Sequence, residues 1–254
     1  MRLHTLLVLC LTPVLAVAAA AGDTADLPAA DEILAQIDSN LVFETRTATI
    51  KMTVEGKRRT RVYSMRSYGR GETDSAIEYT EPARDQGTRM LRLGEQLWLY
   101  MPLVDRTQKI SGHMLRQGMM GSDLSYEDML SSEELRQQYE ARVLGEAELD
   151  DRACWKLEMT ATDESVAYPR RVSWIDQETF IPLRQELYAL SGMLLKTWTM
   201  GEVRDFEGGR KFPTRMVVED HLKKESRTLL ELSEMEFGVE LEEEVFSMRW
   251  LERK

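Results

Sequence analysis

Two histidines outside the amino-terminal apolar segment, His113 and His221, are the only ones around which a hydrolytic site can be built. A serine or cysteine nucleophile needs a histidine beside it as the base. Neither histidine stands in a nucleophile-elbow or metalloprotease motif. His221, within the polar run EDHLKKE, is typical of an exposed strand end. The sequence therefore does not indicate triad or zinc hydrolysis.

Soft metal ligands gather in one short stretch, where His113 and Met114 precede Met119 and Met120. Imidazole and thioether groups suit Cu(I), so a copper site is one interpretation. Methionine is also the flexible, polarizable residue that proteins place where a surface must adapt to apolar partners of varied shape. We prefer this second interpretation and expect no metal.

Three acidic residues, Asp123, Glu127 and Asp128, follow closely in the sequence. Glycoside hydrolysis requires two carboxyl groups that face each other across a sugar, whereas these share one short segment. With Ser125 at a capping position, the stretch Ser125 to Asp128 favours a helix start. A carboxylate partner from elsewhere stays open as an alternative, and the candidates are Asp176, Glu186 and Glu219.

Other catalytic signals are weak. The chain has neither a G-x-x-x-x-G-K-[ST] loop nor the glycine fingerprint of dinucleotide sites. Cys154, on a predicted strand, is a single thiol with no adjacent base. We expect a protein that is not an enzyme and that carries no cofactor.

The first 21 residues predict a secretory signal peptide, with basic Arg2, an apolar run from Leu6 to Val17 and an alanine-rich end. Cys10 lies inside that run, after Leu9, so a lipoprotein anchor there is the less favoured alternative. Removing residues 1–21 takes away Arg2 and no acid, so 33 basic residues become 32 against 44 acidic ones, a net charge near −12. Such a surface repels nucleic acid and anionic lipid head groups at long range, so any membrane contact must be local and apolar. Removing residues 1–21 also takes away Cys10 and leaves Cys154 as the single cysteine. The mature domain, 22–254, must therefore be held together by its core without a disulfide.

Helical spacing predicts one amphipathic helix over 31–42, with Asp31 capping its first turn. From Thr47 onward the period changes to two, and Gly56 marks a hairpin. Ser131 to Glu134 resemble a capping box before a short helix, and 241–253 reads as a terminal helix that carries Trp250. Strand-like segments continue through the rest of the chain, at 139–147, 152–160, 170–176, 181–190, 193–203, 211–219 and 226–236.

No βαβ rhythm appears among these segments, and their spacing favours consecutive antiparallel pairing. The expected fold is mainly β: a single, strongly curved antiparallel sheet with a few helices on its concave face. An open curved sheet has more apolar surface than one or two helices can cover. Some of its apolar side chains should therefore line a cavity suited to acyl chains, since each buried methylene contributes roughly 0.8 kcal/mol.

The stretches GTRMLRLGEQLWLYMP, MMGSDLSYED, YPRRVSWID and FPTRMVVED occur in an order that resembles the LolA-like outer-membrane lipoprotein-sorting proteins. The resemblance covers most of the mature chain. It implies an open half-barrel in the periplasm whose helices or loop act as a lid over the acyl chains of a lipoprotein or another lipid. It also implies transfer from an inner-membrane exporter to an outer-membrane acceptor, and we expect a monomer. The alternative is an accessory module that binds an exporter, with any lipid incidental.

From this resemblance we assign the residues of a lipid-binding wall and of a lid, together with glycines and arginines that accompany the lid. Gly112, Gly118 and Gly121 would let the lid bend, and Arg89, Arg106 and Arg116 flank it, where one could bond a lid carbonyl or a lipid ester. The predicted lipid-binding wall consists of Trp98, Tyr100, Trp155, Leu157, Trp174, Leu195 and Trp198. The predicted lid consists of Met114, Leu115, Met119 and Met120.

Overall fold

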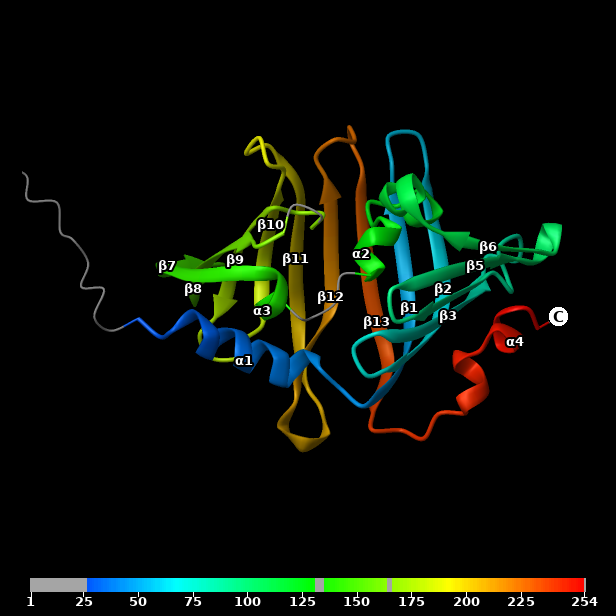
Figure 1. The fold of residues 1–254 in the computed structure, drawn as a ribbon, viewed down its shortest axis with the longest axis horizontal. Coiled ribbons are helices and arrows are strands. Elements are labelled where there is room, and N and C mark those ends of the chain that lie inside the picture. The colour runs from blue at the N-terminus through cyan, green and yellow to red at the C-terminus, as the bar shows by residue number, and fades with distance from the viewer. Residues whose placement is uncertain (1–26, 131–134, 164–165, 254) are drawn as a thin grey trace, which may run out of the picture.

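One antiparallel sheet of 13 strands dominates the computed structural model, which describes residues 27–130, 135–163 and 166–253 (Figure 1). The first six strands are β1 (Thr45–Glu55), β2 (Thr60–Arg70), β3 (Asp74–Glu81), β4 (Arg89–Leu93), β5 (Gln96–Met101) and β6 (Arg106–Ile110). The other seven are β7 (Tyr139–Leu149), β8 (Arg152–Ala161), β9 (Arg170–Asp176), β10 (Pro182–Tyr188), β11 (Leu194–Asp205), β12 (Lys211–Asp220) and β13 (Arg227–Phe237).

Two meanders meet at the centre of this sheet. The strand order is β6-β5-β4-β3-β2-β1-β13-β12-β11-β10-β9-β8-β7, so the first and last strands are neighbours and pair from Arg46 with Phe237 to Glu55 with Arg227. Strands β6 and β7 are the two edges and do not pair with each other in the described part of the chain, so the sheet stays open. The chain that leaves β6 must therefore cross from one edge of the sheet to the other.

The predicted single curved antiparallel sheet is confirmed, and the seven strands predicted after residue 138 each agree with an observed strand to within two residues at either end. The hairpin around Gly56 is the β1–β2 pair. Strand β3 was missed, although Ala76, Ile77 and Tyr79 are buried in it. Acidic residues at both of its ends and at its centre weaken the alternation that marks a strand.

Helix α1 (Ala30–Leu41) is close to its predicted range. It begins one residue before Asp31, so Asp31 lies in the first turn, where a carboxylate favours the helix dipole, and does not cap the helix as predicted. Ile33, Leu34 and Ile37 are buried. Because a 12-residue helix is marginal alone, this burial holds it, at roughly 1.5–3 kcal/mol for each apolar side chain.

The predicted terminal helix over 241–253 is wrong in its extent. A 3-10 turn (Glu243–Phe246) is followed by a separate short helix, α4 (Met248–Leu251). Ser247 between them is extended, and its hydroxyl accepts a hydrogen bond from the Trp250 N–H at 3.2 Å, which starts the second helix. A short helix α3 (Leu135–Gln138) precedes β7, whereas the predicted capping residues 131–134 lie outside the described residues.

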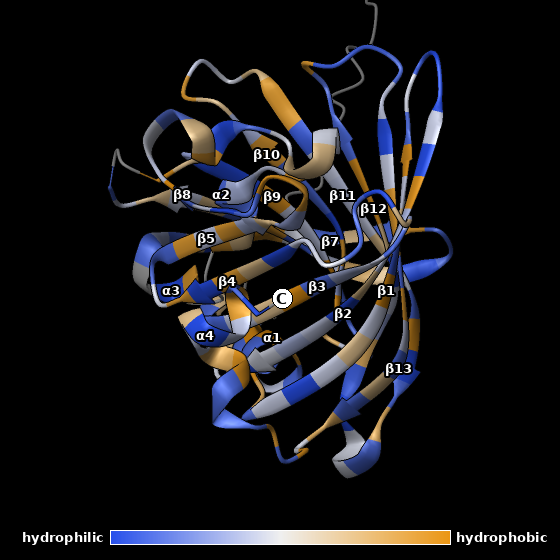
Figure 2. Ribbon diagram, turned by 90° about the vertical axis from the view of Figure 1, so that its right-hand side faces the viewer, coloured by the Kyte–Doolittle hydropathy of each residue, from blue (hydrophilic) through white to orange (hydrophobic). Residues whose placement is uncertain are grey.

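Apolar residues pack on both faces of the sheet. Hydrophobic and hydrophilic residues are mixed along its strands (Figure 2). On the inner face, α1 and α3 cover β7, β8 and β9, with Leu157 and Met159 at the centre. On the outer face, α4 covers β3, β4 and β5 through Trp250 and Leu251. Among the described helices, none has the length and apolar character needed to cross a lipid bilayer.

Candidate functional site

The chain between β6 and residue 130, here called the lid (residues 111–130), lies over the inner face of β1 to β6. It contains two 3-10 turns, Gly112–Arg116 and Met119–Gly121, and helix α2 (Tyr126–Leu130). Its buried side chains are Met119, Leu124 and Tyr126, and the partly buried ones are Met114, Leu115, Met120, Met129 and Leu130. The sheet residues in the same apolar cluster are Ile50, Met52, Val54, Tyr63, Met65, Ile77, Tyr79, Met90, Leu97, Leu99, Met101, Ile110, Trp198, Val218 and Leu230.

A tight internal loop shapes the middle of the lid. Gly118 and Ser125 form an antiparallel bridge, and the Met119 N–H donates to the Leu124 carbonyl at 2.7 Å. A Cβ at Gly118 would stand 2.3 Å from the Ser122 carbonyl oxygen, which is backbone and cannot yield. Glycine is therefore required here by close approach of the chain to itself.

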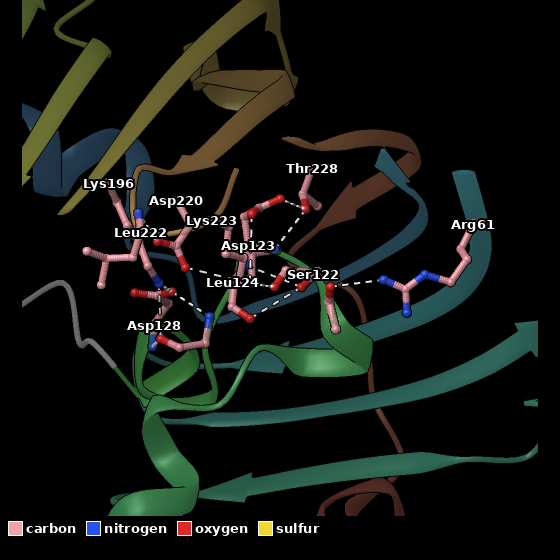
Figure 3. A network of polar contacts seen from close by, with 12 residues as sticks. Arg61, Ser122, Asp123, Leu124, Asp128, Lys196, Asp220, Leu222, Lys223 and Thr228 are labelled. Atoms are coloured by element: carbon pink, nitrogen blue, oxygen red, sulfur yellow. Dashed lines mark hydrogen bonds and ion pairs between the residues drawn. The ribbon is translucent and has the colours of Figure 1, made fainter. Parts of the chain in front are cut away.

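Cationic side chains of the sheet hold the lid by its backbone carbonyls. Arg61 of β2 donates to the Met120 carbonyl at 2.7 Å and to the Gly121 carbonyl at 2.9 Å, and Lys223 donates to the Ser122 carbonyl (Figure 3). Arg92 of β4 donates to Met129 O at 3.0 Å and to Leu130 O at 3.2 Å, at the carboxyl end of α2. Hydrogen bonds to charged donors are the stronger class, so these side chains fasten the lid at its middle and at its carboxyl end.

Asp123 anchors the centre of the lid at a position that is 1 % exposed. Its backbone N–H donates to the Thr228 hydroxyl at 2.9 Å, and that hydroxyl donates back to Asp123 Oδ2 at 2.7 Å (Figure 3). The other carboxylate oxygen, Oδ1, has no hydrogen-bond partner in the described chain and lies 3.8 Å from Lys223 Nζ. Asp123 thus joins the lid to β13 and is shielded from solvent.

A second buried carboxylate, Asp128 of α2, joins the lid to the other half of the sheet. Its Oδ2 accepts from Lys196 Nζ of β11 at 2.5 Å and from the Ser125 N–H at 2.7 Å. Its Oδ1 accepts from the Tyr168 hydroxyl at 2.6 Å. Burial raises the pKa of Tyr168 above its ordinary value, and the Asp128 charge adds to that effect. Asp128 and Lys196 are only 3 % and 9 % exposed, so the ion pair is shielded from water.

A cavity of about 200 Å³ separates the lid from α1. Its floor comes from β10 and β11, while Asp128 and Tyr168 close its polar side. Trp198 lies in its wall with an indole N–H that has no partner in the described chain. The lining residues are Ile37, Asp38, Leu41, Asp128, Leu135, Tyr168, Arg171, Gln185, Leu187, Trp198 and Met200.

Three residues of the predicted wall lie on the inner face. Trp198 lines the cavity and also packs against the apolar cluster beneath the lid. Leu157 and Trp155 pack in the neighbouring cluster covered by α1, where Leu157 is fully buried. All three lie in the half of the sheet that β7 to β13 form.

Four other residues of the predicted wall lie on the opposite face, so they do not share that cavity. Trp98 and Tyr100 pack with Trp250 under α4. Trp174 alternates with the inner-facing Ile175, and its ring stacks beneath Lys156 Nζ at 4.7 Å. Leu195 alternates with Lys196, which reaches inward to Asp128.

The predicted lid residues Met114, Leu115, Met119 and Met120 all pack in the cluster beneath the lid. Met119 is 3 % exposed, whereas His113 beside Met114 is exposed, and the Met114 sulfur accepts from Gln108 Nε2 at 3.2 Å. Across the residues described, no group of three or more His, Cys, Asp or Glu side chains is arranged to hold a metal ion.

Three of the residues considered for catalysis, Cys154, Asp176 and Glu186, have structural roles. Cys154 is fully buried, and burial raises the pKa of its thiol. Asp176 accepts from the Thr179 N–H at 2.7 Å and pairs with Arg152, so it closes a turn. Glu186 accepts from Arg184 and from the Tyr188 hydroxyl, both on its own strand. Cys154 therefore lacks the low-pKa environment of a reactive thiol.

The arginines that hold the lid differ from those assigned in the sequence. Arg89 lies on the outer face, where it pairs with Glu78 at 2.9 Å and donates to the Leu251 carbonyl. Arg106 and Arg116 are exposed. The missed residues are Arg61 and Arg92, and the signal for Arg92 was an arginine between Leu91 and Leu93, on the same face of β4 as the inward-facing Met90.

Known structures share this architecture over nearly the whole chain. A putative outer membrane lipoprotein-sorting protein domain from Vibrio parahaemolyticus is 25% identical, with a TM-score of 0.77 over 87% of this chain and 97% of that chain. A LolA superfamily protein from Nitrosomonas europaea is 26% identical, with a TM-score of 0.73 over 89% and 100%. A DUF1329 family protein from Desulfovibrio piger, 24% identical, aligns with a TM-score of 0.79 over 87% and 96%. No curated protein sequence matches the chain.

The open sheet with its covered inner face defines a LolA-like half-barrel. A family model that is described only as an uncharacterized protein family matches residues 71–253, which is most of the chain. Together with the two lipoprotein-sorting and LolA structures, this match shows that the chain belongs to that LolA-like family.

Proposed function

We propose that this protein is a periplasmic carrier that shields the acyl chains of a lipoprotein or another lipid, without making or breaking a bond. The observation that carries the proposal is the cavity between α1 and the lid, with Trp198, Leu187 and Met200 on its floor. Apolar clusters continue from it in both directions, one beneath the lid and one beneath α1. The similarity to a lipoprotein-sorting domain supports the same function.

The size of the cavity implies that the described form is the closed one. At about 200 Å³ it is smaller than the roughly 300–1,000 Å³ of most small-molecule sites. Methionine, leucine and tyrosine side chains of the lid fill the adjoining space. An acyl chain would enter as these side chains leave, and each methylene it buries contributes roughly 0.8 kcal/mol.

The contacts of the lid are suited to such an exchange. Its carbonyls bond to Arg61, Arg92 and Lys223, and these groups can bond to water once the lid lifts. The apolar side chains beneath it have no such substitute, because water does not replace dispersion and burial. A bound acyl chain replaces the apolar contacts that are lost when the lid lifts. Cargo binding and lid opening are therefore coupled.

Residues 1–21 would direct export and be removed, which leaves 22–254 as one carrier domain. In this function the carrier receives its cargo from an inner-membrane exporter and delivers it to an outer-membrane acceptor, and it acts as a monomer. Its selectivity among acyl chains should be low, because the apolar part of the lining, Ile37, Leu41, Leu135, Leu187 and Met200, offers no directional group to an alkyl chain.

Trp198 provides a direct test, because it lies in the cavity wall. Delipidated mature protein is titrated with a brominated fatty acid, whose bromines quench indole fluorescence on contact. We expect saturable quenching that is lost in Trp198→Phe and kept in Trp250→Phe, since Trp250 packs on the outer face. Quenching that is absent, or that survives in Trp198→Phe, would overturn the proposed site.

Purification from the native envelope, followed by native mass spectrometry, tests the cargo itself. Acyl species that copurify support the carrier. A protein partner without any lipid would instead support an accessory module for an exporter, and it would contradict the carrier function.

A further inference from the structure

Three hairpin turns gather at one end of the sheet, the end at which Lys223 and Arg61 hold the lid. They are the β1–β2 turn (56–59), the β10–β11 turn (189–193) and the β12–β13 turn (221–226), which lie together at the top of Figure 1. An ion pair of 3.3 Å joins Lys57 to Glu225 across the first and third turns. The His221 N–H donates to the Leu195 carbonyl at 2.8 Å, beside the second turn.

Large apolar side chains project from two of these turns into solvent. Leu190 is 88 % exposed, Leu222 is 64 % exposed and Met193 is 52 % exposed. Each stands on the tip of a protruding hairpin and not within a flat patch. Single exposed apolar residues are common on proteins, but three of them on adjacent tips at one end are a local concentration.

The same end of the molecule is basic, although the protein as a whole is acidic. The three turns contain Lys57, Arg58, Arg59, Lys223 and Lys224 against a single acid, Glu225. The opposite end is acidic, because Glu240 and the run Glu242 to Glu244 are exposed there. The charge is thus divided along the strands of a protein whose net charge is −11.

A surface cavity of about 480 Å³ extends this basic end to the lid. Its lining includes Arg59, Arg61, Arg84 and Asp85, and also Met120, which belongs to the lid. Arg61 is engaged by the lid carbonyls. The side chains of Arg59 and Arg84 have no hydrogen-bond or ion-pair partner in the ranges that the structure covers, so their guanidinium groups are available to a ligand.

We propose that this end of the molecule docks on an anionic phospholipid bilayer, with Leu190, Met193 and Leu222 entering the interface and a phosphodiester headgroup held between Arg59 and Arg84. Planar guanidinium groups suit phosphate oxygens. Apolar tips within a basic surface match the combination by which peripheral proteins bind membranes. The part of the lid that Arg61 and Lys223 hold lies beside this surface, so docking would bring the lid to the lipid.

The overall negative charge does not oppose this docking at short range. Strand β1 has 11 residues, which corresponds to about 35 Å between the two ends of the sheet. The Debye length is about 8 Å at physiological ionic strength, so the acidic end is screened from the bilayer. Separate protruding tips also favour a fluid surface, which closes around each one, over the packed pockets of a protein interface.

Vesicle flotation with the mature protein tests the proposal. Vesicles of phosphatidylcholine alone are compared with vesicles that contain added phosphatidylglycerol, and we expect binding to the second only. Each basic residue at an anionic surface strengthens binding about fivefold. The triple change Lys57→Gln, Arg58→Gln and Arg59→Gln should therefore weaken binding on the order of 100-fold.

Matched variants separate the two contributions. Leu190→Ser with Met193→Ser and Leu222→Ser should also release the protein from anionic vesicles. A triple change of exposed arginines away from the tips, Arg66→Gln, Arg106→Gln and Arg204→Gln, should leave binding unchanged. All of these residues are exposed or loop residues, and circular dichroism verifies that each variant is folded.

Several outcomes would overturn the docking surface: no flotation with anionic vesicles, equal loss in the control triple, or binding of soluble glycerophosphate without any binding of vesicles. Capture by an exporter domain in place of vesicles would do the same. Quenching of Trp198 by brominated fatty acid should be unaffected in the tip variants. Failure of docking is thereby distinguished from failure of the carrier function.

Discussion

The ion pair between Lys196 and Asp128 should control how often the lid opens. Lys196 lies on β11 of the sheet and Asp128 on α2 of the lid, with 2.5 Å between Nζ and Oδ2. Replacing Lys196 with methionine keeps the length of the side chain and removes its charge. Asp128 then remains buried with hydrogen bonds from the Tyr168 hydroxyl and the Ser125 N–H.

Breaking a buried ion pair costs about 3–5 kcal/mol, because the remaining charge is uncompensated. The lower value applies here, since two donors to Asp128 remain. The cost is borne by the closed lid alone, because opening exposes Asp128 to water. A change of about 3 kcal/mol corresponds to a roughly 150-fold larger opening constant.

Native-state hydrogen exchange, followed by mass spectrometry, measures this opening. In Lys196→Met the amides of residues 119–130 should exchange on the order of 100-fold faster, while those of the central strands β1 and β13 keep their rates. Lys51→Met serves as the control, because the pair of Lys51 with Glu231 is about half exposed and contributes less than about 1 kcal/mol. Adding Asp128→Asn to Lys196→Met removes the uncompensated charge and should restore most of the protection.

Two results would refute this reasoning. Unchanged exchange in the lid would show that the ion pair does not hold it closed. Equal acceleration in β1 and β13 would show that the pair stabilises the whole fold and not the lid.

Three further predictions concern other parts of the molecule. Gly118→Ala should accelerate amide hydrogen exchange throughout the lid, because the added Cβ would stand 2.3 Å from a backbone carbonyl oxygen. Gly201→Ala is the control and should have no such effect, because nothing lies within 4 Å of its Cβ. Equal effects of the two changes would contradict the close-approach argument. Trp250→Ala should lower the free energy of unfolding in urea by about 3–5 kcal/mol yet leave fatty-acid binding by the folded protein intact, since Trp250 packs on the outer face; lost binding would contradict the division of the faces. Hydrogen bonds from Arg170 and Arg142 lower the pKa of Glu158, so this carboxylate stabilises the fold above the unfolded pKa of about 4.3 and ceases to do so as the pH falls through the lower folded value. Glu158→Gln should therefore be less stable by up to about 1 kcal/mol at pH 7, and this difference should shrink in urea titrations as the pH falls below the unfolded pKa; a difference that does not change with pH would contradict it.

Most of the strands could be predicted because each is a run of β-branched and aromatic residues that a glycine or polar turn ends. Register and strand order needed the structure. The pairing of β1 with β13 joins residues that are far apart in sequence, and no local pattern specifies it. The lid was predicted from its methionines and glycines, and its residues do lie together.

The residues of the predicted wall lie on two opposite faces of the sheet. Sequence alternation alone does not say which of the two faces is the inner one. In β5, Leu97 and Leu99 face the lid whereas Trp98 and Tyr100 face α4, so both sets are apolar. An apolar outer face is explained only once α4 is known to cover it. Arg92 was passed over for a similar reason, since its partners are carbonyls of residues 129 and 130 that sequence spacing does not bring near it.

Each meander is covered by a helix that is joined in sequence to the other meander. Helix α1 precedes β1 in the chain, yet Ile33 and Ile37 pack on Leu157 and its neighbours in the second meander. Helix α4 follows β13, yet Trp250 packs on β3 to β5 of the first. Neither meander can bury its apolar surface without a segment that belongs to the other, so the halves are mutually dependent. Unfolding should consequently proceed as one cooperative transition, and a chain divided at the lid should regain structure only when both fragments are mixed.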